Sequence, residues 1–167
     1  MTLTEIRGQA ITPALALLPA RMSSPEAEVM LLAIGLQESR FQHRRQLVGS
    51  PPRPTGPAKS FWQAEQGGGM VTGLLRYHDD RVRDLAVGLC AVRDVDPSPR
   101  ALWDAIEHDD VLAAGLARLL LWTDPGRLPR LGDVEGALQC YLRTWRPGKP
   151  HPLAWPSNYR QALEAVQ

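Results

Sequence analysis

The spacing of apolar residues along the chain predicts a succession of helices. The most apolar stretch runs from Val29 to Leu36, and it changes abruptly to polar residues at its end. A helix that is apolar on every side is normally buried in the middle of a domain. Ser24-Pro25-Glu26 is a start signal, in which a capping residue is followed by proline and an acid in the first turn. We therefore predict a buried central helix from this signal to about Arg40.

Further helices are expected wherever a capping residue precedes apolar residues spaced three and four apart. The first would run from about Glu5 to Leu18, with Thr4 as its cap and Pro13 as a kink or break. The later ones would start at Gly68, Asp79 or Asp80, Ser98-Pro99, Asp109 or Asp110, Asp133, and Pro156-Ser157. No segment alternates with the period of two that is typical of strands. The predicted fold class is all-α.

The segment from Gln42 to Ser60 interrupts this helical pattern. It is rich in proline, and the chain as a whole has 15 prolines. Its PxxP-like spacing allows two interpretations, a ligand for a partner protein or a stiff loop beside a site, and the second suits a compact domain better. We expect the loop.

Length and composition describe a single domain over residues 1–167. A net charge of +1 gives no reason to expect nucleic acid or an anionic membrane as a partner. No apolar run has the length of a membrane span, and the N-terminal residues lack the features of a signal peptide. We expect a monomer that is made in the cytoplasm without an export signal. Cys90 and Cys140 lie in apolar helical patterns and are expected to be small buried hydrophobic residues.

Several kinds of chemistry have no support in the sequence. The four histidines are scattered, and none is paired with Cys, Asp or Glu at metal-ligand spacing, so no metal or other cofactor is expected. Ser39 has no histidine at a known nucleophile spacing. Gly67-Gly68-Gly69 lacks the Lys-Ser/Thr of a phosphate loop, which leaves a hinge or turn, or a close approach of a polymer to the backbone.

Glu38 is the strongest chemical candidate that remains. Its carboxyl group would lie at the negative end of the helix dipole and among apolar residues, and both effects raise a carboxyl pKa. A raised pKa is what a general acid needs. The alternative is a surface glutamate at a frayed helix end. Together with the aromatic residues, one well-placed acid suits a carbohydrate substrate, because aromatic faces stack on sugar rings.

Four ordered segments carry a resemblance to a known family. Gln37-Glu38-Ser39-Arg40-Phe41 resembles the "QESxF" signature of lytic transglycosylases and related lysozyme-fold enzymes, which cut peptidoglycan. The segment 56–63 looks like the family's "GxxGLMQ" turn, with Trp62 in place of Met. Ala137–Tyr141 followed by Pro147-Gly148 is similar to its "ALAAYNxG" helix, although Leu142 replaces the Asn. Trp155–Tyr159 is similar to its closing "PxxTxxYV" helix.

This resemblance implies a lysozyme-like domain in which Glu38 is the catalytic acid. The substrate would be the bond that joins N-acetylmuramic acid to N-acetylglucosamine in peptidoglycan. A lytic transglycosylase needs one carboxyl group and yields a 1,6-anhydro product, whereas a hydrolytic muramidase often uses a second acid. Glu65, Asp79 and Asp80 are the candidates for that second acid. Because none is clearly placed, we expect a transglycosylase and keep the muramidase as the alternative.

The resemblance also implies roles for the neighbouring residues. Gln63 would line the cleft and hold a substrate amide or carbonyl. Tyr141 would orient Glu38 through a hydrogen bond, unless it serves only to pack the core. Trp62 is the expected stacking residue, and the remaining predicted substrate contacts are Ser39, Phe61 and Glu65. The indoles of Trp103, Trp122 and Trp145 are expected in the core.

Three further expectations concern biology and alternatives. A wall-cutting enzyme without an export signal needs a carrier, so we expect a phage or prophage origin, with delivery by lysis, a virion or a secretion machine. A non-catalytic phage structural protein that binds peptidoglycan is one alternative from another class. An all-α adaptor, in which Glu38 is a surface residue and the motif match is chance, is the second.

Overall fold

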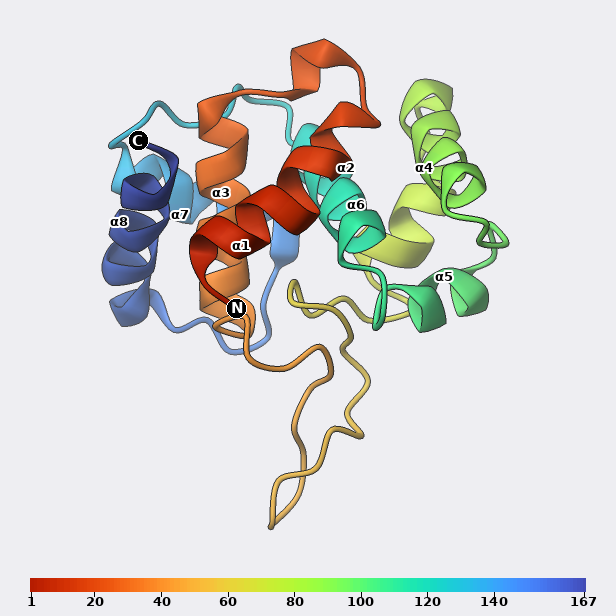
Figure 1. Ribbon diagram of the computed structural model, residues 1–167, viewed down its shortest axis with the longest axis horizontal. Coiled ribbons are helices and arrows are strands. Elements are labelled where there is room, and N and C mark those ends of the chain that lie inside the picture. Colours follow the sequence, from red (N-terminus) through yellow and green to blue (C-terminus); the bar gives the residue numbers. More distant parts are fainter.

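Two buried helices form the centre of the protein, whose computed structural model describes all 167 residues (Figure 1). They are α3 (Pro25–Glu38) and α6 (Asp110–Trp122). Every residue of α3 from Val29 to Leu36 is buried, and so is every residue of α6 from Leu112 to Leu121. The prediction of a buried central helix is confirmed, and α6 is a second helix of the same kind.

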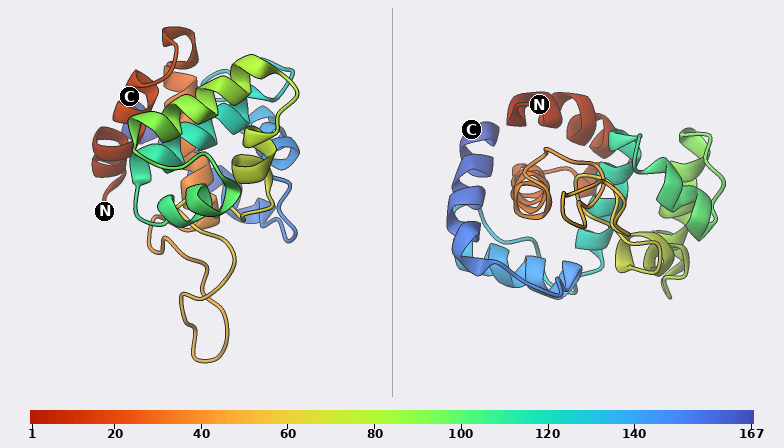
Figure 2. Two further views of the ribbon diagram at one scale, coloured as in Figure 1. Left: turned by 90° about the vertical axis from the view of Figure 1, so that its right-hand side faces the viewer. Right: turned by 90° about the horizontal axis from the view of Figure 1, so that it is seen from below.

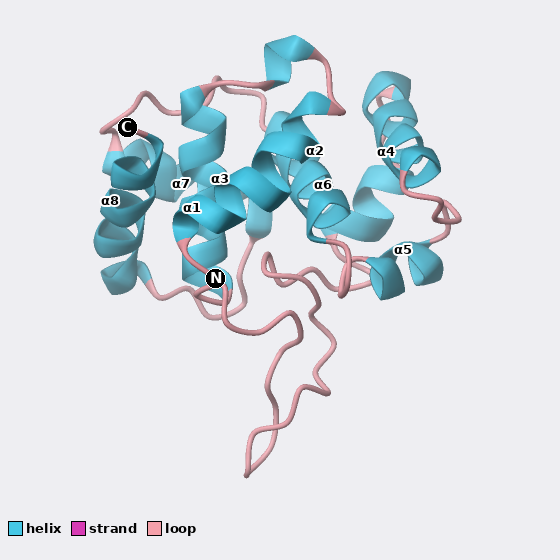
Figure 3. Ribbon diagram, viewed as in Figure 1, coloured by secondary structure: helices cyan, strands magenta, loops and turns pink.

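The other helices surround this pair and divide between two sides of the molecule. On the side of α3 lie α1 (Leu3–Ile6), α7 (Val134–Trp145) and α8 (Trp155–Val166), and on the side of α6 lie α4 (Asp80–Val92) and α5 (Pro99–Ala105). The short helix α2 (Thr12–Ala16) follows α1 and packs against α6. The long C-terminal helix α8 packs along α3, and α4 packs against α6. Figures 2 and 3 show this division and the absence of strands, so the predicted all-α class is confirmed.

The predicted starts of five helices are confirmed by their caps. In each, the side chain of the residue before the helix accepts a hydrogen bond from a backbone N–H in the first turn, which satisfies a group that the helix itself leaves unpaired. These capping residues are Ser24, Asp79, Ser98, Asp109 and Asp133.

The first and last helices differ from the prediction at their starts. The first is capped by Thr2 rather than Thr4, because Thr2 and Glu5 form a capping box in which each side chain bonds the other's backbone N–H. A π-helical turn, η1 (Arg7–Ile11), then separates α1 from α2 immediately before Pro13. The last helix begins at Trp155, directly after a one-turn 3₁₀ helix, η4 (Pro152–Ala154).

The proline-rich segment 42–60 projects from the body as a long loop (Figure 1). Its base is anchored by Lys59, whose ammonium group is buried and lies 2.8 Å from Asp104 and 2.9 Å from Glu107. The same ammonium group lies 3.6 Å from the centre of the Trp103 ring. These contacts tie the end of the loop to α5 and to the residues just after it.

Two smaller observations complete the fold. None of the helices combines the length and the apolar character that crossing a membrane would require. Cys90 and Cys140 are both buried and unpaired, as expected for small hydrophobic residues. Burial raises the pKa of the Cys140 thiol to about 11, so this group stays neutral.

Candidate active site

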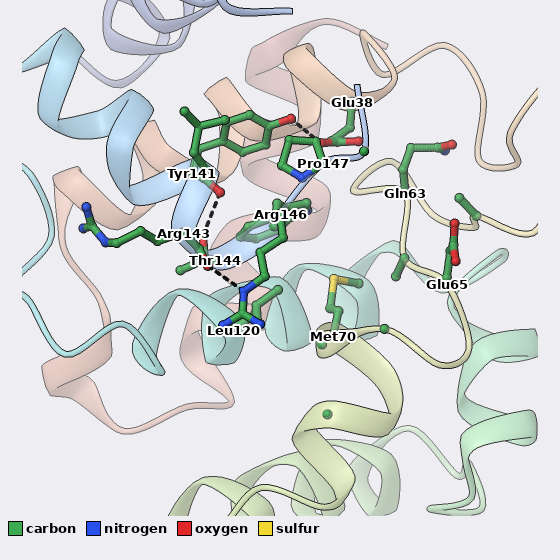
Figure 4. A pocket seen from close by; sticks show the side chains of 18 of the residues that line it. Glu38, Gln63, Glu65, Met70, Leu120, Tyr141, Arg143, Thr144, Arg146 and Pro147 are labelled. Atoms are coloured by element: carbon green, nitrogen blue, oxygen red, sulfur yellow. Dashed lines mark hydrogen bonds between the residues drawn. The ribbon is translucent and has the colours of Figure 1, made fainter. Parts of the chain in front are cut away.

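A cleft of about 1400 Å³ separates the two sides of the molecule. One wall is formed by the C-terminal half of α7 and the chain that follows it, and the other by residues 63–77, which include the π-helical turn η3 (Gly69–Gly73). Leu120 near the end of α6 and residues 123–125 just after that helix close the floor between these walls. Figure 4 shows Glu38 at one end of the cleft, at the point where α3 stops.

Glu38 lies where the cleft continues into a second cavity. This smaller cavity, of about 380 Å³, is bounded by the base of the projecting loop and by α8. The two cavities share Gln37, Glu38, Gln46, Gln63 and His151. The groove therefore extends on both sides of Glu38.

The carboxyl group of Glu38 has one direct partner, the Tyr141 hydroxyl, which donates to its Oε1 at 2.7 Å. The hydrogen bond that the sequence predicted between these residues is present. Burial of the carboxyl group raises the pKa of Glu38, and the Tyr141 hydrogen bond, which favours the ionised form, limits that rise. No cation forms an ion pair with Glu38. The protein thus holds a half-buried carboxyl group that keeps its proton to a higher pH than an ordinary glutamate.

The chain turns sharply after Glu38 and folds back against the end of α3. The ring of Phe41 folds back onto Gly35, where a Cβ atom would lie only 2.1 Å from the ring. Arg40 and Phe41 both take left-handed backbone conformations, at φ +52° and +55°. Non-glycine residues of this kind cost free energy and cluster at functional sites. The left-handed conformations of Arg40 and Phe41 therefore end α3 at Glu38.

Ser39 joins the end of α3 to the loop that carries Gln63. Its hydroxyl group donates to the Phe61 carbonyl oxygen at 2.7 Å and accepts a hydrogen bond from the Phe41 N–H. The residue lines the smaller cavity, but both functions of its hydroxyl are already used by the protein. We therefore assign Ser39 a positioning role in place of the predicted substrate contact.

The prediction that Trp62 stacks on a sugar is wrong, and Phe61 does not reach the cleft either. Both side chains are at most 1% exposed. The Trp62 indole lies against α3 and donates its Nε1–H to the Leu31 carbonyl oxygen at 2.9 Å, and both rings make edge contacts with Phe41. These aromatic residues fill the core behind the site because α3 and Phe41 provide an apolar surface for them.

Gln63 and Glu65 do line the cleft. Gln63 takes a left-handed backbone conformation at φ +51°, and its side-chain Nε2 donates to the Ser60 carbonyl oxygen at 2.8 Å. Its Oε1 remains an acceptor. Glu65 is exposed on the wall opposite α7 and forms no ion pair. Asp79 and Asp80 do not line the cleft, so Glu65 is the only one of the three proposed second acids that does.

Three features of the cleft were missing from the sequence prediction. Trp145 was expected in the core, but it is half-buried, lines the cleft and donates its Nε1–H to the Trp62 carbonyl oxygen at 3.0 Å. Its signal in the sequence was its position four residues after Tyr141, which places both on one face of α7. The others are the cationic residues after α7 and the pair of Asp124 with Arg143.

The other two tryptophans expected in the core also lie elsewhere. Trp103 is half-buried on α5, where it donates its Nε1–H to the Pro57 carbonyl oxygen at 2.9 Å. Trp122 is exposed at the end of α6, with the guanidinium groups of Arg21 and Arg118 near its ring. Trp103 packs against the edge of the core with cations on its other side, and Trp122 is exposed, so neither ring is fully buried as predicted.

Comparisons of the chain with protein-family models, with curated proteins and with solved structures found no match. No group of three or more His, Cys, Asp or Glu side chains is arranged to hold a metal ion. Any function is therefore inferred from the residues of the cleft and from the motif resemblance.

Proposed function

We propose that the protein cleaves the glycosidic bond between N-acetylmuramic acid and N-acetylglucosamine in peptidoglycan, as a lytic transglycosylase of lysozyme-like fold. The observation that carries this proposal is the half-buried carboxyl group of Glu38, held by the Tyr141 hydroxyl at 2.7 Å where the two cavities of the groove meet. The ordered resemblance of the four sequence segments to that family agrees with it.

The hydrogen bond from Tyr141 makes the two carboxyl oxygens of Glu38 chemically different. Oε1 accepts the tyrosine hydrogen bond, so the acidic proton belongs on Oε2. Glu38 donates this proton to the glycosidic oxygen as the bond from that oxygen to the muramic acid C1 breaks. The C6 hydroxyl of the same muramic acid then bonds to C1 and returns its proton to Glu38. The product is a 1,6-anhydro ring, and the acid is regenerated without a second carboxyl group.

The hydrogen bond from Tyr141 supports both halves of this cycle. A general acid works best when its pKa lies near the operating pH. Burial raises the pKa of Glu38, while the Tyr141 hydroxyl stabilises the carboxylate that forms after proton transfer. One contact thus allows both donation and recovery of the proton.

The groove suits a polymer because it continues on both sides of Glu38. We assign Gln63, which lines both cavities, to the N-acetyl groups of the sugars. Its Oε1 accepts a hydrogen bond from an amide N–H, and the contact of its Nε2 with the Ser60 carbonyl oxygen fixes the orientation of the carboxamide. Trp145 replaces Trp62 as the stacking candidate, because its ring lines the cleft.

A hydrolytic muramidase is the second candidate, and one observation favours it. Glu65 lines the same cleft as Glu38 and has no ion-pair partner, so it is available as a base for water. The two reactions differ in their products. Hydrolysis leaves a reducing muramic acid end. The transglycosylase reaction leaves an anhydro end, which is lighter by one water molecule, about 18 Da.

The test is digestion of purified cell walls, followed by mass spectrometry of the released muropeptides. Wild type should release anhydro products, and Glu38→Gln should release none. Asp124→Asn is the matched control, because it also neutralises a cleft carboxyl group but leaves Glu38 and Tyr141 untouched. Reducing ends would assign hydrolysis, with Glu65→Gln then expected to be inactive. If wild type releases nothing, or Glu38→Gln is as active as wild type, the proposed catalysis is wrong.

A further inference from the structure

The chain re-enters the cleft directly after α7. Arg146 caps that helix in a left-handed conformation at φ +49°, and residues 146–149 together with His151 line the larger cavity. This segment brings two cationic side chains, Arg146 and Lys149, to one wall. The facing wall carries none, because η3 and its surroundings consist largely of glycine and apolar residues there.

The two cations have no acidic partner within the protein. The Nε of Arg146 donates to the Arg143 carbonyl oxygen at 3.2 Å, and its two terminal nitrogens make no hydrogen bond. Lys149 forms neither a hydrogen bond nor an ion pair. Arg143 differs, because both of its contacts go to Asp124, at 3.1 and 2.8 Å. Figure 4 shows the Arg146 side chain lying in the cleft beside Leu120.

The acids that line the cleft do not neutralise this wall. Glu38 is bonded to Tyr141 and makes no ion pair, and Asp124 is already paired with Arg143. Glu65 lies across the cleft and is not in contact with either cation. The dipole of α7 stabilises a cation beside its C-terminus, which explains in part why a cationic residue stands at position 146. That effect falls off within one turn, so it does not account for Lys149.

We infer that Arg146 and Lys149 bind carboxylate groups on the peptide stems of the glycan, so that the preferred substrate is a peptide-bearing strand rather than a bare one. This inference rests on the proposed function. The sugar backbone of peptidoglycan carries no charge where its muramic acid is amide-linked, whereas the attached peptides carry carboxylates. Guanidinium and ammonium groups are the side chains that pair best with carboxylates.

The test measures binding, with Glu38→Gln as the parent so that the ligand is not consumed. The ligands are soluble glycan strand fragments, either with their peptide stems or with the stems removed by an amidase. The parent should bind the peptide-bearing fragments more tightly, and added salt should reduce that difference. Adding Arg146→Gln and Lys149→Gln should weaken binding of peptide-bearing fragments about three- to tenfold more than binding of stripped ones, as expected for two exposed charge pairs.

The matched control adds Arg127→Gln and Arg160→Gln, which remove two exposed cations that line neither cavity and form no ion pair. This control should keep the preference of the parent. Equal binding of both fragments by the parent would overturn the inference, even if wild type cleaves walls as proposed. A loss no larger than in the control would overturn it as well. Failure to bind either fragment would contradict both this inference and the proposed function.

Discussion

The ends of α3 and α6 place two carboxyl groups in one cleft, yet the two have opposite acidities. Both helices are buried, Glu38 is the last residue of α3, and Asp124 follows the last residue of α6 by two positions. Burial raises the pKa of Glu38, whereas the Arg143 guanidinium holds the pKa of Asp124 below its usual range.

The partner on α7 accounts for this difference. Tyr141 donates one neutral hydrogen bond to Glu38, and Arg143, two residues later, makes two charged hydrogen bonds to Asp124. A neutral donor leaves a carboxyl group able to hold a proton, while a cation fixes it as a carboxylate. A position at the end of a buried helix is therefore not sufficient to make an acid.

The largest expected effect comes from removing the proton of Glu38. Glu38→Gln should lower wall cleavage by about 100- to 10,000-fold, the usual contribution of a general acid. Asp124→Asn should retain activity within a few fold, because that carboxylate is ionised already. Initial rates of muropeptide release measure both. Similar losses of activity in the two variants would contradict a special role for the Glu38 carboxyl group.

Tyr141→Phe should reduce the rate by about ten- to a hundredfold, because the carboxyl group loses the contact that orients it. Its pH profile is the more specific readout. The tyrosine hydrogen bond lowers the pKa of Glu38, so its loss raises that pKa further and extends activity to higher pH. Tyr159→Phe is the control, since that hydroxyl bonds the backbone at Gly132, away from the cleft. An unchanged pH profile in Tyr141→Phe would argue against this role.

Glu38→Gln should also stabilise the protein at neutral pH. The pKa of Glu38 is raised in the folded state, so the stability it provides is complete below its unfolded pKa and is lost as the pH rises through its folded pKa. The variant has no such loss. Its Tm should match wild type near pH 4 and exceed it by about 2–4 °C at neutral pH. Thermal unfolding across this range measures the difference, and a variant that is less stable at neutral pH would contradict it.

The smallest effect is expected for Arg143→Gln. Asp124 has a lowered pKa in the folded protein, so its pairing stabilises above the unfolded pKa and the contribution disappears as the pH falls through the folded pKa. The variant should lose about 1–2 °C in Tm at pH 7 and nothing in strong acid, because the Arg143 side chain is 54% exposed and water screens its charge. Wall cleavage should keep the wild-type pH profile. A shifted profile would show that the two carboxyl groups are coupled.

The sequence predicted the parts of this fold that depend on neighbouring residues. Ser24, Asp79, Ser98, Asp109 and Asp133 all precede apolar periodic segments, and each caps its helix. Capping is local, because the bonded groups lie two or three residues apart. The first cap was misplaced, since Thr2 and Thr4 are both suitable and only the capping box with Glu5 decides between them.

Contacts between distant segments were predicted less well. Trp62 lies in a loop, and nothing nearby in the sequence shows that α3 provides a carbonyl group and an apolar surface for its indole. The pair of Asp124 and Arg143 likewise depends on how α6 and α7 pack. The contact of Tyr141 with Glu38 spans 103 positions and was anticipated only because the family resemblance paired those two segments.

A carboxyl-carbon NMR titration of the labelled protein tests the central comparison most directly, since it follows Glu38 and Asp124 in one sample. Glu38→Gln and Asp124→Asn assign the two signals by their absence. We predict that Glu38 titrates above the ordinary range of glutamate, and that Asp124 titrates below the ordinary range of aspartate. A Glu38 midpoint at or below the ordinary glutamate value would contradict the account of this residue as the proton donor.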